Sequence, residues 1–180
     1  MDSDLIVLVL VVVTFAAAFN LWLTFRLSAR IREMTAPAFT VTLGDPVPSF
    51  EGTASAGSRA IRSSDLAGQP AVLVFLSAGC STCAGHIPEL AAILDGAGRL
   101  GVSLWIVPAD DVHDIARLVG GTPLAERVLV LEPAHRLRLN PMRSAPFYLF
   151  IDENSVARAS NNLGDEDWTT FVEQMLEGAG

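Results

Sequence analysis

Cys80 and Cys83 are the two cysteines of the chain, and two residues separate them. They follow an apolar run from Val72 to Leu76 and precede a stretch with helical spacing. A Cys-x-x-Cys pair between a strand and a helix is typical of a redox-active dithiol. Backbone N–H groups and the dipole at a helix start stabilise a thiolate, which is the nucleophilic form of cysteine. The sequence therefore predicts a thiol–disulfide exchange site.

The surrounding pattern predicts the elements that position this pair. Strands are expected at 71–77, 102–107, 127–131, 146–151 and 155–159, with a short hairpin or an extended entry segment in 47–66 and one helical turn at 63–66. Helices are expected at 81–94, from 110 or 111 to 119, and after a cap at Asp165. Strands that alternate with helices, followed by a hairpin and a closing helix, predict an α/β fold: a mixed central sheet with helices on both faces.

The N-terminal region has a different composition. Residues 5–25 include no charged side chain, and as a helix they would span roughly 30 Å, the thickness of a bilayer core. We expect a transmembrane anchor at 1–25, a juxtamembrane tether at 26–43 and a folded domain at 44–180, with membrane lipid as the partner of residues 5–25. A cleaved signal peptide is the alternative, but the leading residues are acidic and the apolar run exceeds the usual length of about 7–15.

The charge excludes several classes of function. The net charge is −8, which argues against nucleic acid as a partner, and the absence of lysine excludes Schiff-base chemistry. The side of the membrane is ambiguous. Arg26, Arg30 and Arg32 follow the apolar run and place the domain in the cytoplasm by the positive-inside rule, whereas stable oxidising roles need an extracytoplasmic compartment.

The order of elements, with the dithiol after the first core strand, resembles the thioredoxin fold. More narrowly, residues 44–178 are similar to the membrane-anchored thioredoxin-like redoxins, which include proteins of cytochrome c maturation and of methylamine dehydrogenase maturation. Three features carry the resemblance: the motif at 75–83, Pro88 eight residues after Cys80, and the segment 144–152 with Pro146.

The resemblance implies a role for each of these residues. Cys80 would attack, Cys83 would resolve the mixed disulfide, and Ala145 would offer its backbone to the client across a cis bond to Pro146. Ser81 and Thr82 complete the motif, and Pro88 kinks the helix. The resemblance further implies no cofactor and no resident metal, a protein client with a cysteine or disulfide, a membrane redox partner and an extracytoplasmic domain. It leaves open whether the pair oxidises, reduces or isomerises.

The sequence departs from the family pattern at three positions. Gly79 replaces the usual tryptophan, Thr82 replaces the usual proline, and Val74 stands where ordinary thioredoxins have a buried acid. These changes indicate a specialised client and not a general reductase.

Two other functions compete. A copper-binding assembly factor on the same fold would use Cys80 and Cys83 with His86 or His135, because soft thiolates suit Cu(I). A peroxidase would need a proline seven residues before the attacking cysteine and a threonine three residues before it. Those positions hold Leu73 and Ser77.

Overall fold

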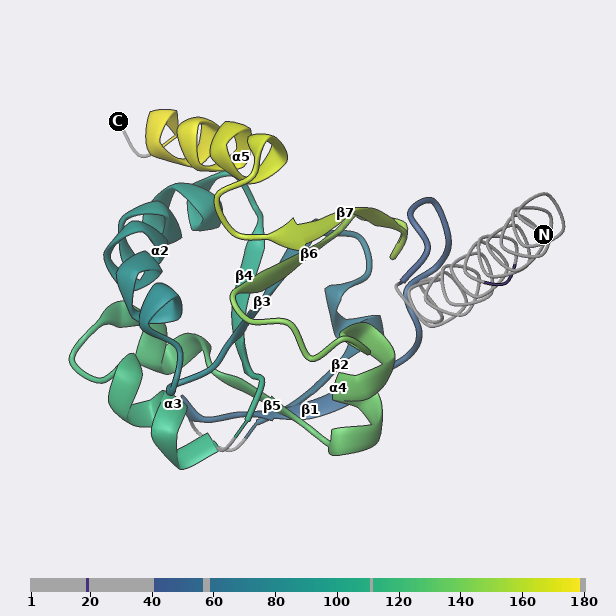
Figure 1. Cartoon of the computed structure of the whole chain (residues 1–180). Helices are drawn as coiled ribbons and strands as arrows, with labels where there is room; N and C mark the ends of the chain where they lie inside the picture. The colour runs from purple at the N-terminus through teal and green to yellow at the C-terminus, as the bar shows by residue number, and fades with distance from the viewer. Residues whose placement is uncertain (1–18, 20–40, 57–58, 111, 179–180) are drawn as a thin grey trace, which may run out of the picture. The chain divides into compact units, whose positions relative to one another are not determined.

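The computed structural model describes residues 19, 41–56, 59–110 and 112–178, of which the part from residue 41 onward belongs to one compact unit (Figure 1). The predicted anchor and tether lie outside the described residues, apart from position 19 and positions 41–43. Among the residues described, no helix combines the length and apolar character that a membrane crossing requires. Val41 is buried in the core, so the unit includes residues ahead of the predicted boundary at 44.

A four-stranded sheet in the order β4-β3-β6-β7 forms the centre of the unit. β3 (Ala71–Leu76) pairs in parallel with β4 (Ser103–Pro108) and antiparallel with β6 (Phe147–Ile151), which pairs antiparallel with β7 (Ala157–Asn162). The sheet is therefore mixed, as predicted. A parallel pair needs a crossover connection, and the helix α2 (Ser81–Arg99) supplies it between β3 and β4.

All six side chains of β3 are buried. They face two separate cores: Val72, Val74 and Leu76 lie in the first, and Ala71, Leu73 and Phe75 lie in the second. Successive strand side chains point to opposite faces, so an unbroken apolar run is what a strand covered on both faces requires. This burial fixes the carboxyl end of β3, from which the chain leads directly to Cys80.

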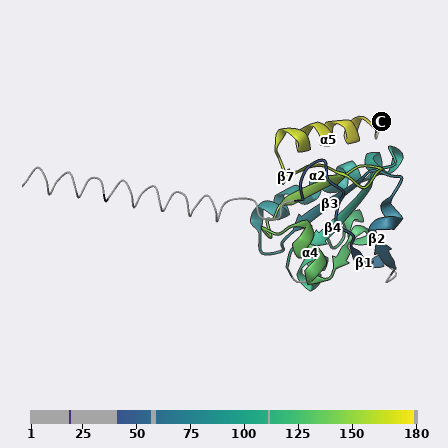
Figure 2. The same ribbon diagram turned by 90° about the vertical axis from the view of Figure 1, so that its right-hand side faces the viewer.

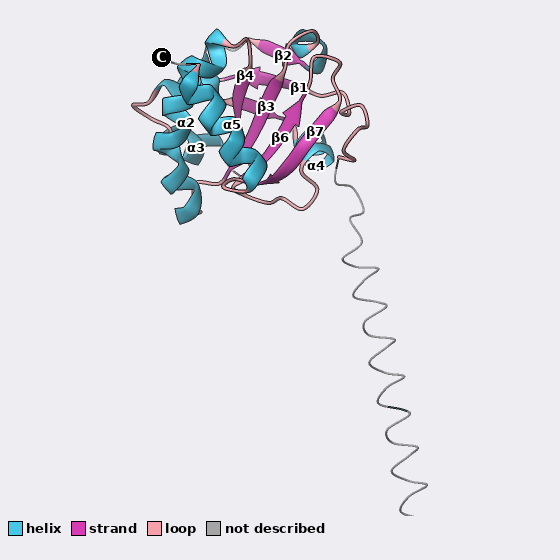
Figure 3. Ribbon diagram, turned by 90° about the horizontal axis from the view of Figure 1, so that it is seen from above, coloured by secondary structure: helices cyan, strands magenta, loops and turns pink. Residues whose placement is uncertain are grey.

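The first core lies under α2, α3 (Val112–Leu118) and α5 (Glu166–Glu177), which are grouped together in Figure 3. The two long helices meet at Gly96 of α2. A Cβ at that position would lie 1.7 Å from the carbonyl oxygen of Met175 in α5. The missing side chain therefore lets the helix backbones touch, and it fixes α5 against the helix that carries the cysteines.

The second core is covered mainly by strands. β1 (Glu51–Ala54), β2 (Ala60–Arg62) and β5 (Leu129–Leu131) form an antiparallel sheet in the order β2-β1-β5. Two short helices, η2 (Ser63–Leu66) and α4 (Pro133–Leu139), add Leu66 and Leu139 to this core. Figure 2 shows β1, β2 and α4 on the side of the central sheet opposite α5. Helices thus contribute to both faces, but on this face they are short.

Two segments differ from the sequence-based prediction. No element was expected between residues 131 and 146, but His135 lies in α4, which starts with Pro133 at a position where proline needs no hydrogen bond. The strand expected at 127–131 is shorter, because Pro123–Arg127 form the 3₁₀ helix η3 and β5 begins at Leu129.

The last hairpin is also displaced along the chain. Its second strand was expected at 155–159 and runs from Ala157 to Asn162. The reason is the side chain of Asp152, which accepts hydrogen bonds from the backbone N–H groups of Asn154 and Val156. These bonds extend the turn to residue 156 and delay the return strand.

Candidate active site

Cys80 is the N-cap residue of α2, and its Sγ accepts a hydrogen bond from the backbone N–H of Cys83 at 3.3 Å. The thiol is partly exposed. Hydrogen bonds from the Cys83 thiol, and from the backbone N–H groups of Cys83 and Thr82, lower the pKa of Cys80 below its ordinary value of 9.0, although partial burial opposes them. These contacts favour the thiolate at Cys80, the form that attacks disulfides.

Cys83 lies in the first turn of α2 and is fully buried in the first core. Burial, and then the hydrogen bond to Cys80, raise the pKa of Cys83 from 9.0 to about 12. Val74, at the position of the family's buried acid, is an apolar neighbour in the same core. The two thiols therefore have opposite properties: Cys80 is partly exposed and has a lowered pKa, and Cys83 is buried and has a raised pKa.

The loop of residues 140–146, here called the proline loop, faces the exposed thiol. The Ala145–Pro146 peptide bond is cis, as the resemblance implied. The Cys80 Sγ lies 3.7 Å from the carbonyl oxygen of Ala145, to which a protonated thiol donates. The buried Asn140 holds this loop, because its side-chain amide donates to the Ser144 carbonyl at 2.7 Å and its Oδ1 accepts from the Ser144 N–H at 3.0 Å.

The remaining motif residues lie on α2. Ser81 and Thr82 are exposed in its first turn, beside the capping sulfur. Pro88 lies inside the helix, as predicted, where it has no N–H to offer the carbonyl four residues earlier. The structure thus brings Cys80, Cys83 and Ala145 together, while the roles of all these residues in exchange stay predictions.

One contact close to the dithiol was not predicted from the sequence. The Ser77 hydroxyl donates to the Asp110 carboxylate, and the Ser77 carbonyl accepts the N–H of Cys80 at 3.2 Å. From the sequence, Asp110 was expected only as a possible first residue of a helix. The parallel register pairs Leu76 with Pro108, so the residues that follow the two strands meet at one edge of the sheet. The signal for this contact was the register of the parallel strands and not any local motif.

The two histidines considered as copper ligands are engaged elsewhere. His86 Nδ1 lies 3.3 Å from Glu89 Oε1, which also accepts the indole N–H of Trp168 at 2.7 Å. His135 Nδ1 accepts the backbone N–H of Glu51 in β1 at 3.0 Å. Within residues 41–56, 59–110 and 112–178, no three His, Cys, Asp or Glu side chains gather in a metal-binding arrangement. The structure therefore offers no observation in favour of the copper hypothesis.

The sequence model of the AhpC/TSA family matches residues 43–171. No curated protein matches the chain.

Several solved structures are similar to the domain of this chain that carries the two cysteines. A candidate DsbE thiol:disulfide interchange protein of Chlorobium tepidum is 21% identical, with a TM-score of 0.63, over 78% of this chain and 100% of that one. The thioredoxin domain of a thiol-disulfide oxidoreductase of Bacteroides vulgatus is 18% identical, with a TM-score of 0.63, over 76% and 99%. A thiol:disulfide interchange protein of a Bacteroides species is 20% identical, with a TM-score of 0.62, over 77% and 93%. At this identity the likeness establishes the thioredoxin-like fold.

Proposed function

This chain belongs to the AhpC/TSA family, and from that premise we propose that it is a thiol–disulfide oxidoreductase that exchanges disulfides with a protein client. One observation carries the proposal: the sulfur that caps α2 is partly exposed and has a lowered pKa, while the second sulfur, three residues on, is buried and keeps its proton. This is the division that a nucleophile and a resolving thiol require.

The exchange has two balanced steps. The Cys80 thiolate attacks one sulfur of a client disulfide, a bond forms between Cys80 and that sulfur, and the client's other sulfur leaves as a thiolate that takes up a proton. Cys83 then loses its proton and attacks the Cys80 sulfur, so that the Cys80–Cys83 disulfide forms and the second client thiol departs. Two electrons pass from the dithiol to the client, and the reverse sequence oxidises a client dithiol.

The surroundings of the two sulfurs support this order of events. Cys80 reaches the surface beside the Ala145 carbonyl, where a client backbone can lie against the proline loop. Cys83 is shielded from the client until the mixed disulfide has formed. We assign Ala145 and Pro146 to client binding on this basis. The resemblance to redoxins of cytochrome c and methylamine dehydrogenase maturation supports the maturation of another redox enzyme as the setting of the reaction.

We further propose that residues 5–25 anchor the chain in a membrane, with the domain on the extracytoplasmic side. The uncharged N-terminal run supports the anchor, and the resemblance to membrane-anchored redoxins supports the side, against the arginines that follow the run. A reporter that is active in one compartment, fused after Gly180, tests the side. Activity on the cytoplasmic side only would refute this orientation.

Trapping of the mixed disulfide tests the exchange reaction. In cells that produce Cys83→Ser, a disulfide-linked adduct with a client should accumulate, because the resolving sulfur is missing. The matched variant Cys80→Ser keeps a hydroxyl acceptor at the N-cap and should trap nothing. An adduct with Cys80→Ser and none with Cys83→Ser would reverse the assigned roles, and no adduct with either variant would contradict the proposal.

A further inference from the structure

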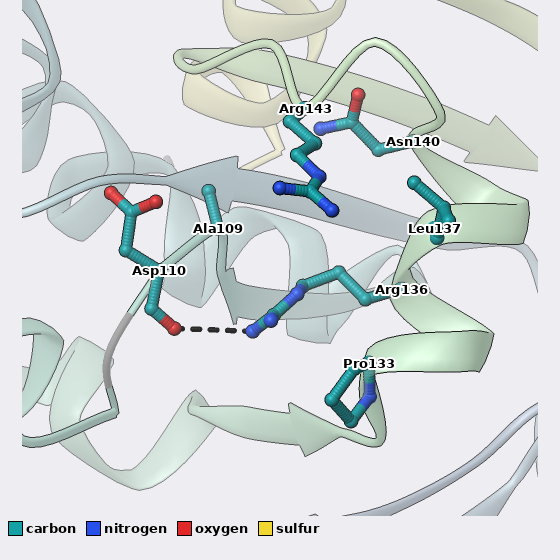
Figure 4. A pocket seen from close by; sticks show the side chains of 7 residues that line it. All are labelled: Ala109, Asp110, Pro133, Arg136, Leu137, Asn140 and Arg143. Carbon is teal, nitrogen blue, oxygen red and sulfur yellow. Dashed lines mark hydrogen bonds between the residues drawn. The ribbon is translucent and has the colours of Figure 1, made fainter.

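Close to the dithiol lies a cavity of about 170 Å³, here called the arginine cavity. It is lined by Ala109 and Asp110 after β4, by Pro133 and Arg136 of α4, and by Asn140 and Arg143 of the proline loop. Figure 4 shows the Arg143 side chain reaching down from its loop into the cavity, with its guanidinium group turned toward that of Arg136. A cavity of about 150 Å³ accepts a benzene molecule, so this one has room for a single side chain.

The contacts of the lining residues connect the cavity to the reactive sulfur on two sides. Asp110 bonds Ser77, whose carbonyl accepts the Cys80 N–H. On the other side, Asn140 holds Ser144, next to the Ala145 carbonyl that lies 3.7 Å from the Cys80 Sγ. A polypeptide bonded to Cys80 and lying on the proline loop therefore passes beside the arginine cavity.

The lining of the cavity carries two arginines and one carboxylate, so its net charge is positive. Arg136 is fixed, because its Nη1 donates to the carbonyls of Pro108 at 3.2 Å and Asp110 at 3.1 Å (Figure 4 draws the second bond). The backbone N–H of Arg143 donates to the Asn140 carbonyl at 3.0 Å, but its guanidinium group has no hydrogen bond or ion pair within the part of the chain described here. The Asp110 carboxylate bonds the Ser77 hydroxyl. Two facing guanidinium groups without a shared anion repel each other, and a carboxylate between them would accept paired N–H bonds from either.

We propose that the arginine cavity binds an acidic side chain of the client, an Asp or Glu near the client's cysteine, and so selects clients with an acidic residue at that place. This inference rests on the proposed exchange function and names its substrate class. The selectivity is local, since the chain as a whole has a net charge of −8 and repels acidic polypeptides at a distance. Beside Cys80, however, Arg136 and Arg143 attract an acidic side chain of the client.

The test uses short peptides with one cysteine, activated as a pyridyl disulfide, and the full-length Cys83→Ser variant. Attack by the Cys80 thiolate on the peptide sulfur forms the Cys80–peptide disulfide, breaks the bond to the pyridyl sulfur and releases the pyridine thiolate, whose protonated form is followed by absorbance. A glutamate is placed in turn at each of the three positions on either side of the cysteine, with a glutamine peptide matched to each. Every rate is divided by the rate at which a small neutral thiol attacks the same peptide.

We expect the glutamate peptide to react about threefold to tenfold faster than its glutamine match at one or two adjacent positions, because a partly exposed arginine pair gives a modest gain. Arg143→Gln should abolish the preference, and Arg143→Lys should keep part of it. Arg138→Gln is the matched control: it removes the same charge from an exposed arginine of α4 outside the cavity lining, and the preference should survive.

The outcomes separate the two proposals. Reaction with every peptide at equal normalised rates would overturn the acidic-client inference and leave the exchange function standing. If Arg143→Gln and Arg138→Gln reduce the preference equally, the preference comes from net charge, and the inference is overturned. No reaction with any peptide, glutamine forms included, would count against the exchange function itself.

Discussion

The rate at which Cys83 attacks a disulfide provides a quantitative test of how far burial suppresses the reactivity of this thiol. The change is Cys80→Ser, which removes the neighbouring sulfur and leaves Cys83 as the single thiol. Burial is the largest cause of its raised pKa of about 12, ahead of the hydrogen bond to Cys80, so most of the shift should remain in this variant.

The expected rate follows from that pKa. A thiol of pKa about 12 is ionised about a thousandfold less at neutral pH than one of pKa 9.0. Its thiolate is more nucleophilic, by about twentyfold for a Brønsted coefficient near 0.45. Cys83 in folded Cys80→Ser should therefore attack a small pyridyl disulfide up to about fiftyfold more slowly than an exposed thiol of pKa 9.0, and restricted access would slow it further.

The assay follows the released pyridine thione by absorbance between pH 6 and pH 10, a range chosen to include ordinary thiol ionisation at about 8.5. An ordinary thiol should approach its plateau above that pH, whereas the rate for Cys83 should still rise at the alkaline end. The same variant unfolded in urea is the control and should react at the ordinary rate. Equal rates for folded and unfolded protein, or a plateau near pH 9, would refute the reasoning from burial.

Two further predictions concern the scaffold. Gly96→Ala should lower the free energy of unfolding by about 3 kcal/mol or more, because the added methyl group meets a backbone carbonyl that cannot rotate away. Gly98→Ala, in the same helix with open space around it, should instead stabilise by up to about 1 kcal/mol, and urea denaturation that ranks the two alike would contradict the close-packing argument. Asp165→Ala should cost about 2–4 kcal/mol, since its carboxylate caps α5 and accepts the hydroxyl of the buried Tyr148 at 2.9 Å. In a Tyr148→Phe background the cost should fall to that of the cap alone, about 1 kcal/mol, and an unchanged cost would show that the two side chains are not coupled.

The dithiol and the central strand could be predicted because their signals are local. The spacing of Cys80 and Cys83 and the unbroken apolar run before them lie within about a dozen residues of sequence, and both the strand and the helix start formed where expected. The cis bond before Pro146 was anticipated by resemblance, which supplies information that the residue pattern alone does not contain.

The arginine cavity could not be predicted, because its residues come from three segments that meet only in the folded chain: residues 109–110, the helix α4 and the proline loop. Asp110 contacts Ser77 only because β3 and β4 end at the same level. Arg136 points into the cavity only because residues 133–139 form a helix. Gly96 is a further example. A glycine inside a helix is unfavourable by itself. Gly96 is explained by the backbone of α5, which begins about 70 residues later and leaves no room for a side chain at this position.

The capping role of Cys80 has an evolutionary consequence. Serine, threonine, aspartate and asparagine cap helices well, so the start of α2 does not depend on sulfur. A relative that replaced Cys80 by serine would lose the reaction and keep the fold, and only natural selection for the chemistry would restore the cysteine. Buried Cys83 behaves as a small apolar residue and could become alanine or valine at moderate cost. Descendants of such a protein are therefore expected to persist as stable domains without redox activity, free to acquire binding roles on the same surface.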